Sequence, residues 1–273
     1  MNYRHSFHAG NFADLVKHAL VLWLVERRQA SGPVTVIDTH AGAGLYDLTG
    51  DAARSREAEA GIVRLMTTDG RPPLIEALAA EVAAMNPNDG VTYYPGSPLL
   101  MARHLGPQDR YLSFELHPPV LDLLEQALKP FAQADARGGD GFDQAVAEAK
   151  RSPGPLVLID PPFEKPDDYH RAADTGAAIV KADARATVAI WTPLKDMETF
   201  DGFLRRLDQG GARRVLVAEA RLRPLTNPMK MNGCAMVVLN PPSGAEAAAR
   251  EICDWLVDTL GEAGAKSEVW MAD

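Results

Sequence analysis

Apolar residues recur at two different spacings along this chain, and the spacing separates helices from strands. From Phe12 to Gln29 they follow the spacing of one face of a helix. Asn11 is a suitable N-cap for that helix, and Ser31-Gly32-Pro33 ends it. The β-branched run from Val34 to Ile37 then predicts a short strand.

After residue 90, short apolar runs alternate with amphipathic segments. Strands are predicted at residues 110–115, 135–137, 156–160, 186–191, 214–220, 234–239 and 267–271. Helices are predicted at residues 98–104, 119–128, 142–150, 169–181, 197–207 and 245–260. This alternation predicts an α/β fold, with a mainly parallel, Rossmann-like sheet, helices on both of its faces and a late antiparallel hairpin.

The first strand leads into a glycine-rich turn, from Asp38 to Gly44, and such a turn normally opens directly into a helix. Here a polar, alanine-rich stretch follows instead, with amphipathic helices predicted at residues 57–67 and 73–85. We therefore expect a Rossmann-like domain, residues 1–46 and 91–273, with a helical subdomain inserted at residues 47–90. Ser97 is expected to cap the displaced helix, with Pro98 at its first position.

The buried strand at residues 156–159 ends on Asp160-Pro161-Pro162-Phe163. The two prolines lack N–H groups and fix the backbone, so they hold the carboxylate and the aromatic ring at the carboxyl end of the strand. A carboxylate, a fixed carbonyl and an aromatic face suit a flat ring that carries an exocyclic amine. The tetrapeptide resembles the Asp-Pro-Pro-aromatic signature of methyltransferases that act on N6 of adenine, and a Pro-Pro turn after a strand is the simpler alternative.

Other acidic residues also follow predicted strands, and parallel strands bring their carboxyl ends to one edge of a sheet. Asp38 precedes the glycine turn, Glu115 ends the next strand, and Asp140 lies in the loop after that. Together they describe a pocket for an adenosine-containing cofactor, in which Glu115 would accept ribose hydroxyls and Asp140 an adenine amino group. Taken singly, each could be a turn, cap or surface residue.

The chemistry of the turn favours S-adenosylmethionine over a dinucleotide. A pyrophosphate site needs Gly-x-Gly-x-x-Gly at the start of a helix, but the third position after Gly44 is Asp47, whose charge would repel phosphate. S-adenosylmethionine carries a cationic sulfonium and no phosphate, so an acidic pocket suits it.

Composition sets the broad class of the protein. The chain has 273 residues, 46% of them hydrophobic, and a net charge of −9, which argues against a nonspecific polyanion binder. No apolar run is long enough to span a bilayer, and the start has no signal-peptide pattern. The two cysteines, Cys234 and Cys253, are expected to be buried free thiols, and no spacing suggests a metal site. We expect a cytoplasmic protein, a monomer without a bound metal.

Taken in order, the motifs resemble those of the RlmJ family of bacterial 23S ribosomal RNA adenine-N6 methyltransferases. The matching blocks are Tyr3 to Asn11, Lys17-His18, Asp38 to Gly44, Tyr93 to Pro98, Glu115 to Pro118, Asp140 to Phe142 and Asp160 to Phe163. The family usually has tyrosine where this chain has Phe163, so a contact made by the phenol would be lost here.

The resemblance implies a class I methyltransferase that uses S-adenosylmethionine and acts on 23S ribosomal RNA. It places Asp160 as the catalytic residue and Tyr3 at the RNA. It also implies that the cofactor is bound by Lys17, His18, His40, Ser97, Glu115, Asp140, Gly141 and Asp160. Without the resemblance, a Lys-His pair in the middle of a helix would more often lie on the surface. Pro161 and Phe163 would bind the target base.

Three other functions remain open at this stage. A DNA adenine methyltransferase could use the same tetrapeptide. A nucleotide-binding oxidoreductase is disfavoured by the absent third glycine. A noncatalytic RNA-binding protein on the same fold is disfavoured because Asp160 and Phe163 are both present.

Overall fold

The protein is built around one eight-stranded sheet. The computed structural model describes residues 7–49, 56–88, 90–165, 167–226 and 231–272. The strand order is β10-β8-β9-β7-β6-β1-β4-β5. The strands are β1 (Thr35–Asp38), β4 (Arg110–Glu115), β5 (Ala134–Gly138), β6 (Leu156–Ile159), β7 (Thr187–Pro193), β8 (Val215–Arg221), β9 (Gly233–Leu239) and β10 (Lys266–Ala272).

Strands β5, β4, β1, β6 and β7 run parallel, and β9, β8 and β10 complete the sheet with antiparallel pairings. The mainly parallel sheet and the late antiparallel hairpin are therefore confirmed. The chain passes from β1 to β4 and β5 on one side and then returns to β6 on the other. This reversal of direction beside β1 is where open α/β sheets bind their ligands.

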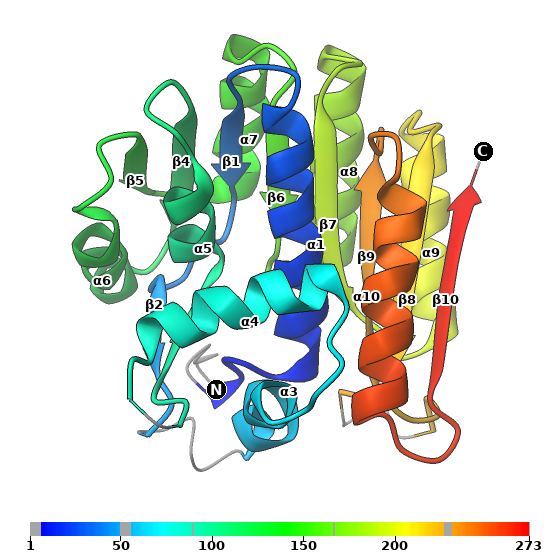
Figure 1. Cartoon of the computed structure of the whole chain (residues 1–273). Coiled ribbons are helices and arrows are strands. Elements are labelled where there is room, and N and C mark those ends of the chain that lie inside the picture. The colour runs from blue at the N-terminus through cyan, green and yellow to red at the C-terminus, as the bar shows by residue number, and fades with distance from the viewer. Residues whose placement is uncertain (1–6, 50–55, 89, 166, 227–230, 273) are drawn as a thin grey trace.

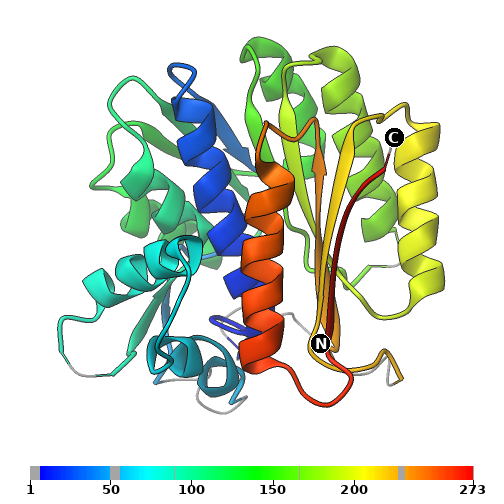
Figure 2. The same ribbon diagram turned by 45° about the vertical axis from the view of Figure 1, so that its right-hand side comes forward.

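Helices cover both faces of the sheet (Figures 1 and 2). In the view of Figure 1, α1 and α10 lie in front of the sheet, and α7, α8 and α9 lie behind it. The helices are α1 (Phe12–Gln29), α5 (Ser97–His104), α6 (Pro118–Leu128), α7 (Gly141–Arg151), α8 (Asp168–Ala182), α9 (Met197–Gln209) and α10 (Ala245–Leu260).

The alternation of side chains along the strands produces two cores. In β6, Leu158 packs into the core beneath α1 and α10, and its neighbours Val157 and Ile159 pack into the core beneath α7, α8 and α9. All four residues of β6 are buried, as a strand covered on both faces requires. Both cysteines are buried free thiols, as expected.

The stretch after the glycine turn packs against α1. It begins with β2 (Leu45–Asp47), which pairs with β3 (Tyr93–Pro95) as a two-stranded ribbon that the pattern did not predict. Between them, the expected helix at 57–67 is a π-helical turn, η2 (Glu59–Val63), followed by α3 (Arg64–Met66). Helix α4 spans Pro73–Met85, as predicted.

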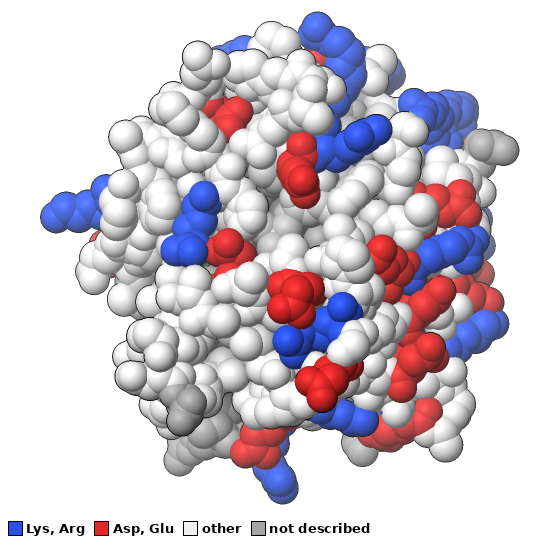
Figure 3. Space-filling view, in the orientation of Figure 1, with Lys and Arg blue, Asp and Glu red and all other residues white. Residues whose placement is uncertain are grey.

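The surface carries charges of both signs. On the face seen in Figure 3, acidic and basic side chains are interspersed, and the described residues form no continuous basic patch there. Within the described parts of the chain, no helix is both long and apolar enough to cross a membrane.

Candidate functional site

The predicted acidic residues do meet at one edge of the sheet. Asp38 ends β1, Glu115 ends β4 and Asp160 follows β6, and these three strands are neighbours in the order β6-β1-β4. The prediction that the strand tips converge is therefore confirmed. The N-terminal end of α1 lies against the same edge, because Lys17 reaches Asp160 directly.

The Lys17 ammonium group lies between two carboxylates. Its Nζ donates to Asp160 Oδ2 at 2.6 Å and contacts Asp14 Oδ1 at 2.8 Å. The side chains of Lys17, Asp14 and Asp160 are only 4%, 6% and 11% exposed. Burial opposes the charge on Lys17, but the two carboxylates outweigh burial and raise its pKa well above the ordinary value. Lys17 is thus a buried cation and does not decorate the surface.

Helix α1 presents a second buried polar side chain one residue later. His18 Nδ1 lies 2.7 Å from the Tyr94 hydroxyl of β3, and the two rings stack. His18 is 1% exposed. The ribbon therefore fixes the orientation of a histidine that the family resemblance places in the cofactor site.

Asp38 is fully buried and holds two hydroxyl groups. Its Oδ2 accepts from Ser97 Oγ at 2.8 Å and from the Tyr111 hydroxyl at 3.0 Å. Burial raises the pKa of Asp38 to about 6, although these two hydrogen bonds oppose the rise. The expected N-cap role of Ser97 is wrong: the helix is capped by Gly96, and the Ser97 hydroxyl is drawn to the buried carboxylate instead.

The glycine turn is shaped by side chains above and below it. Gly42 has a φ of +70°, and a Cβ there would lie 2.3 Å from the Tyr46 hydroxyl. The Gly42 N–H donates to Glu115 Oε2 at 3.1 Å, and the other Glu115 oxygen accepts from the His117 N–H. Glu115 therefore ties the turn to the tip of the neighbouring strand while it also lines the edge.

His40 and Gly141 meet where the turn approaches α7. A Cβ on Gly141 would lie 1.9 Å from the Thr39 carbonyl oxygen, so only glycine allows this approach. The ring of His40 packs edge-on against Phe142. Burial lowers the pKa of His40 to about 4, so the imidazole is neutral at physiological pH.

Asp140 caps α7 and pairs with α8. Its Oδ1 accepts from the Phe142 N–H, and its Oδ2 accepts from Arg171 at 3.0 Å. Burial alone would raise the pKa of Asp140, but the hydrogen bond and charge of Arg171 together with the backbone hydrogen bonds lower it.

The ring of Phe163 is more buried than an aromatic ring on which a base stacks would be. Its ring packs 4.5 Å from the centre of Tyr169 and 5.7 Å from that of Trp191, and the residue is 4% exposed. Its φ of +51° is uncommon for an aromatic residue, and its carbonyl accepts from Lys195. Pro161 is buried at the same corner. Stacking on a base stays a prediction, and it requires the ring to uncover a face.

Some site residues were missed and one cannot be placed. Asp14, Tyr94 and Tyr111 hold Lys17, His18 and Asp38, and none of them was singled out. Only Asp14 has a local signal, since a carboxylate three residues before a lysine on a helix can pair with it. Tyr3 lies outside the described residues.

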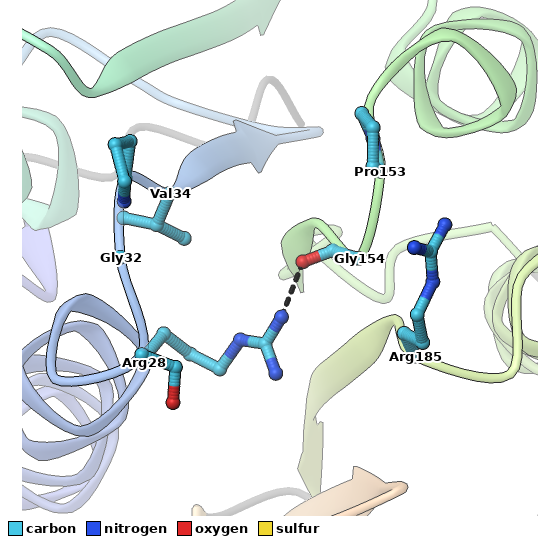
Figure 4. A pocket seen from close by; sticks show the side chains of 8 residues that line it. Arg28, Gly32, Val34, Pro153, Gly154 and Arg185 are labelled. Atoms are coloured by element: carbon cyan, nitrogen blue, oxygen red, sulfur yellow. Dashed lines mark hydrogen bonds between the residues drawn. The ribbon is translucent and has the colours of Figure 1, made fainter.

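A separate hollow lies at the opposite end of the sheet. It has a volume of about 320 Å³ and is lined by Arg28, Gly32, Gly154 and Arg185 among others (Figure 4). These residues precede or border the amino ends of β1 and β6, so this hollow is not the site at the carboxyl edge. Among the described residues, no cluster of histidine, cysteine and acidic side chains could hold a metal ion.

Comparison with known proteins identifies the family. The family model described as "Ribosomal RNA large subunit methyltransferase D, RlmJ" matches residues 31–272. The chain belongs to the RlmJ family. It is 34% identical to ribosomal RNA large subunit methyltransferase J of Escherichia coli K12 over 97% of this chain and 95% of that protein. The Haemophilus influenzae protein of the same name is 34% identical over 98% of this chain and 96% of its own length.

A solved structure shows that the fold is shared over nearly the whole chain. Protein LPL1258 of Legionella pneumophila superposes with a TM-score of 0.87 at 24% identity, covering 97% of this chain and 99% of that one. RlmJ membership confirms the resemblance read from the motifs, the Rossmann-like methyltransferase fold and S-adenosylmethionine as the methyl donor.

The residues at the carboxyl edge fit that cofactor. Gly42 packs closely against Tyr46 and Gly141 against Thr39, so backbone without side chains forms these parts of the edge. The edge carries the carboxylates of Glu115 and Asp160, which suit ribose hydroxyls and a cationic sulfonium.

Proposed function

We propose that the protein transfers a methyl group from S-adenosylmethionine to N6 of a specific adenine in 23S ribosomal RNA. The observation that carries the proposal is the Asp160 carboxylate, held by Lys17 at 2.6 Å beside Pro161, at the tip of β6 and next to the tip of β1. RlmJ family membership supports the RNA class of the substrate.

The cofactor site is proposed along the tips of β1, β4 and β5. Glu115 would bind the ribose hydroxyls and Asp140 the adenine amino group, while the glycine turn supplies backbone contacts. His40 and Gly141 would form the wall between them. The residues proposed to line the site are Lys17, His18, His40, Ser97, Glu115, Asp140, Gly141 and Asp160.

The target adenine would be flipped from its stack or taken from an unpaired region, because N6 of a paired base is otherwise out of reach. Asp160 and the Pro161 carbonyl would each accept one N6 hydrogen, which turns the nitrogen lone pair toward the methyl donor. When bound, S-adenosylmethionine supplies an electrophilic methyl group on its sulfonium sulfur. A carboxylate is too weak a base to deprotonate a neutral aromatic amine, so Asp160 stabilises the positive charge that develops on N6 and then accepts the proton.

Phe163 is proposed to contact the base from the side opposite the donor. Stacking of a base on an aromatic side chain contributes about 1–3 kcal/mol. Tyr3 is proposed to contact the RNA as well. We further propose that the protein acts as a monomer in the cytoplasm, without a metal ion.

The direct test is transfer of labelled methyl from S-adenosylmethionine to unmodified 23S ribosomal RNA, with digestion to nucleosides. The expected product is N6-methyladenosine. DNA of matched sequence tests the alternative that the tetrapeptide serves DNA adenine methylation. Label that appears in DNA and not in RNA would overturn the proposed substrate, and label on another atom would overturn the proposed chemistry.

A further inference from the structure

The segment that leads into α1 contacts the expected insertion, residues 47–90. His8 Nδ1 lies within 2.9 Å of Glu57, and Asn11 Nδ2 donates to Glu57 Oε2 at 3.1 Å. The hydrogen bond and charge of Glu57 raise the pKa of His8, although burial opposes the rise. The insertion therefore contributes one carboxylate that contacts both ends of the short segment from His8 to Asn11.

Backbone atoms also join the insertion to this segment. The Ile62 N–H donates to the Gly10 carbonyl at 2.9 Å, and a Cβ on Gly61 would lie only 2.2 Å from that oxygen. From the other side, a Cβ on Gly10 would lie 2.7 Å from the Ile62 side chain. Both glycines are needed for this approach, and Gly61 belongs to the π-helical turn η2, a type of distortion frequent at functional sites.

Asp14 links this contact to the buried charges of Lys17 and Asp160. The Gly10 N–H donates to Asp14 Oδ2 at 3.0 Å, while Asp14 Oδ1 contacts Lys17 Nζ at 2.8 Å. Lys17 in turn holds Asp160 at 2.6 Å. Gly10 is therefore fixed through its carbonyl by the insertion and through its N–H by the carboxylate that positions Lys17.

We propose that Glu57 and Gly61 are positioning residues, through which the insertion sets the geometry of the Lys17–Asp160 pair. This inference rests on the proposed function of Asp160 and adds a role for the insertion in the chemistry. The two residues act through Gly10 and Asp14 and touch neither substrate nor donor. A misplacement of about 1 Å can cost about a hundredfold in rate, so a small shift of Gly10 is sufficient.

The test compares Glu57→Gln with Glu59→Gln in the full-length protein. Glu59 lies two residues away and forms an exposed pair with Arg56, so it is a matched control. The Glu57→Gln variant should lower kcat about tenfold with KM for the RNA changed less than twofold, while Glu59→Gln keeps wild-type values. The nitrogen NMR signal of the Lys17 ammonium should shift in Glu57→Gln and not in Glu59→Gln.

A second variant, Gly61→Ala, tests the backbone contact and should shift the same Lys17 signal further. An unchanged Lys17 signal and an unchanged kcat in folded Glu57→Gln would overturn the inference, whatever Gly61→Ala does. A purely structural role would lower the melting temperature of Glu57→Gln and leave kcat intact, which also overturns it. If the wild-type protein transfers no methyl group to RNA, the proposed function fails, and the Lys17 signal still decides the positioning role.

Discussion

At the scale of single residues, the buried ammonium group of Lys17 organises the carboxyl edge of the sheet. A buried charge is costly unless it is paired, and Lys17 has carboxylates on two sides. The three groups together carry a net negative charge, because two carboxylates face one ammonium. That excess suits an edge where positive charge moves from a sulfonium to an amine.

Replacing Lys17 by methionine should destabilise the protein strongly. Asp14 and Asp160 would both lose the buried ammonium group that they share, and loss of one partner of a buried pair typically costs about 3–5 kcal/mol. Urea denaturation measures the change. The control is Arg206→Met, which breaks an exposed pair with Asp174 and should leave the stability nearly unchanged. Equal effects of the two substitutions would contradict the burial of Lys17.

His40 should give the stability a specific dependence on pH. Its pKa is about 4 in the folded protein against 6.5 in the unfolded chain, so the unfolded chain binds more protons between these values. Stability should therefore fall as the pH drops from 6.5 to 4. Asp38, with its pKa raised to about 6, acts in the opposite direction over part of this range.

The difference between wild type and His40→Gln isolates the histidine. Denaturant unfolding at several pH values should show the wild type losing stability relative to the variant below pH 6.5. A constant difference across the range would mean that the imidazole titrates normally in the folded protein.

Phe163 should matter for both the core and the reaction. Phe163→Ala removes a ring buried against Tyr169 and Trp191, which should cost about 3–5 kcal/mol of stability and also lower methyl transfer. Phe163→Tyr restores the usual residue of the RlmJ family and should retain the rate within a few-fold. Thermal melts and initial rates on the RNA measure both effects, and a large loss of rate in Phe163→Tyr would show that the pocket is shaped differently.

At the scale of elements, the spacing of apolar residues predicts long helices and strands better than short ones. The bounds of α1, α4 and α10 match the predicted ranges, because several turns of amphipathic spacing define each of them. The β2–β3 ribbon was not predicted, since strands of three residues are too short to show alternation. The π-helical turn η2 was predicted as ordinary helix, because its distinction depends on how closely Gly61 approaches Gly10.

The candidate site was predictable only where a residue carries its own signal. Strand tips located Asp38, Glu115 and Asp160, because an acidic residue after an apolar run is visible locally. The partners Tyr94 and Tyr111 lie 76 and 73 residues from His18 and Asp38 in the chain, and nothing local marks such pairings. Ser97 was misassigned as a cap for the same reason.

The substitution Gly141→Ala tests whether the close approach of α7 to the end of β1 shapes the cofactor site. A Cβ would meet the Thr39 carbonyl at 1.9 Å, so Gly141→Ala should push α7 away from His40 and weaken S-adenosylmethionine binding about tenfold or more. Calorimetric titration of S-adenosylmethionine measures the affinity. Gly106→Ala is the control, because the nearest atom to its Cβ would be 3.6 Å away. Wild-type affinity in Gly141→Ala would mean that this junction does not border the cofactor.

At the scale of the whole molecule, the sheet brings the glycine turn and the Asp160 tetrapeptide to adjacent strand tips. Strand β1 ends at the glycine turn, and its neighbour β6 ends at the Asp160 tetrapeptide. Helix α1 lies against that edge and places Lys17 beside Asp160. Methyl transfer is therefore expected to depend on parts of the chain that are far apart in sequence.

The most direct measurement is single-turnover methyl transfer to 23S ribosomal RNA by Asp160→Ala beside the wild type. Lys17 keeps Asp14 as its partner in this variant, so the protein should remain folded, as circular dichroism would verify. We predict that methyl transfer is abolished. Transfer at a near-normal rate by the folded variant would contradict the catalytic role of Asp160.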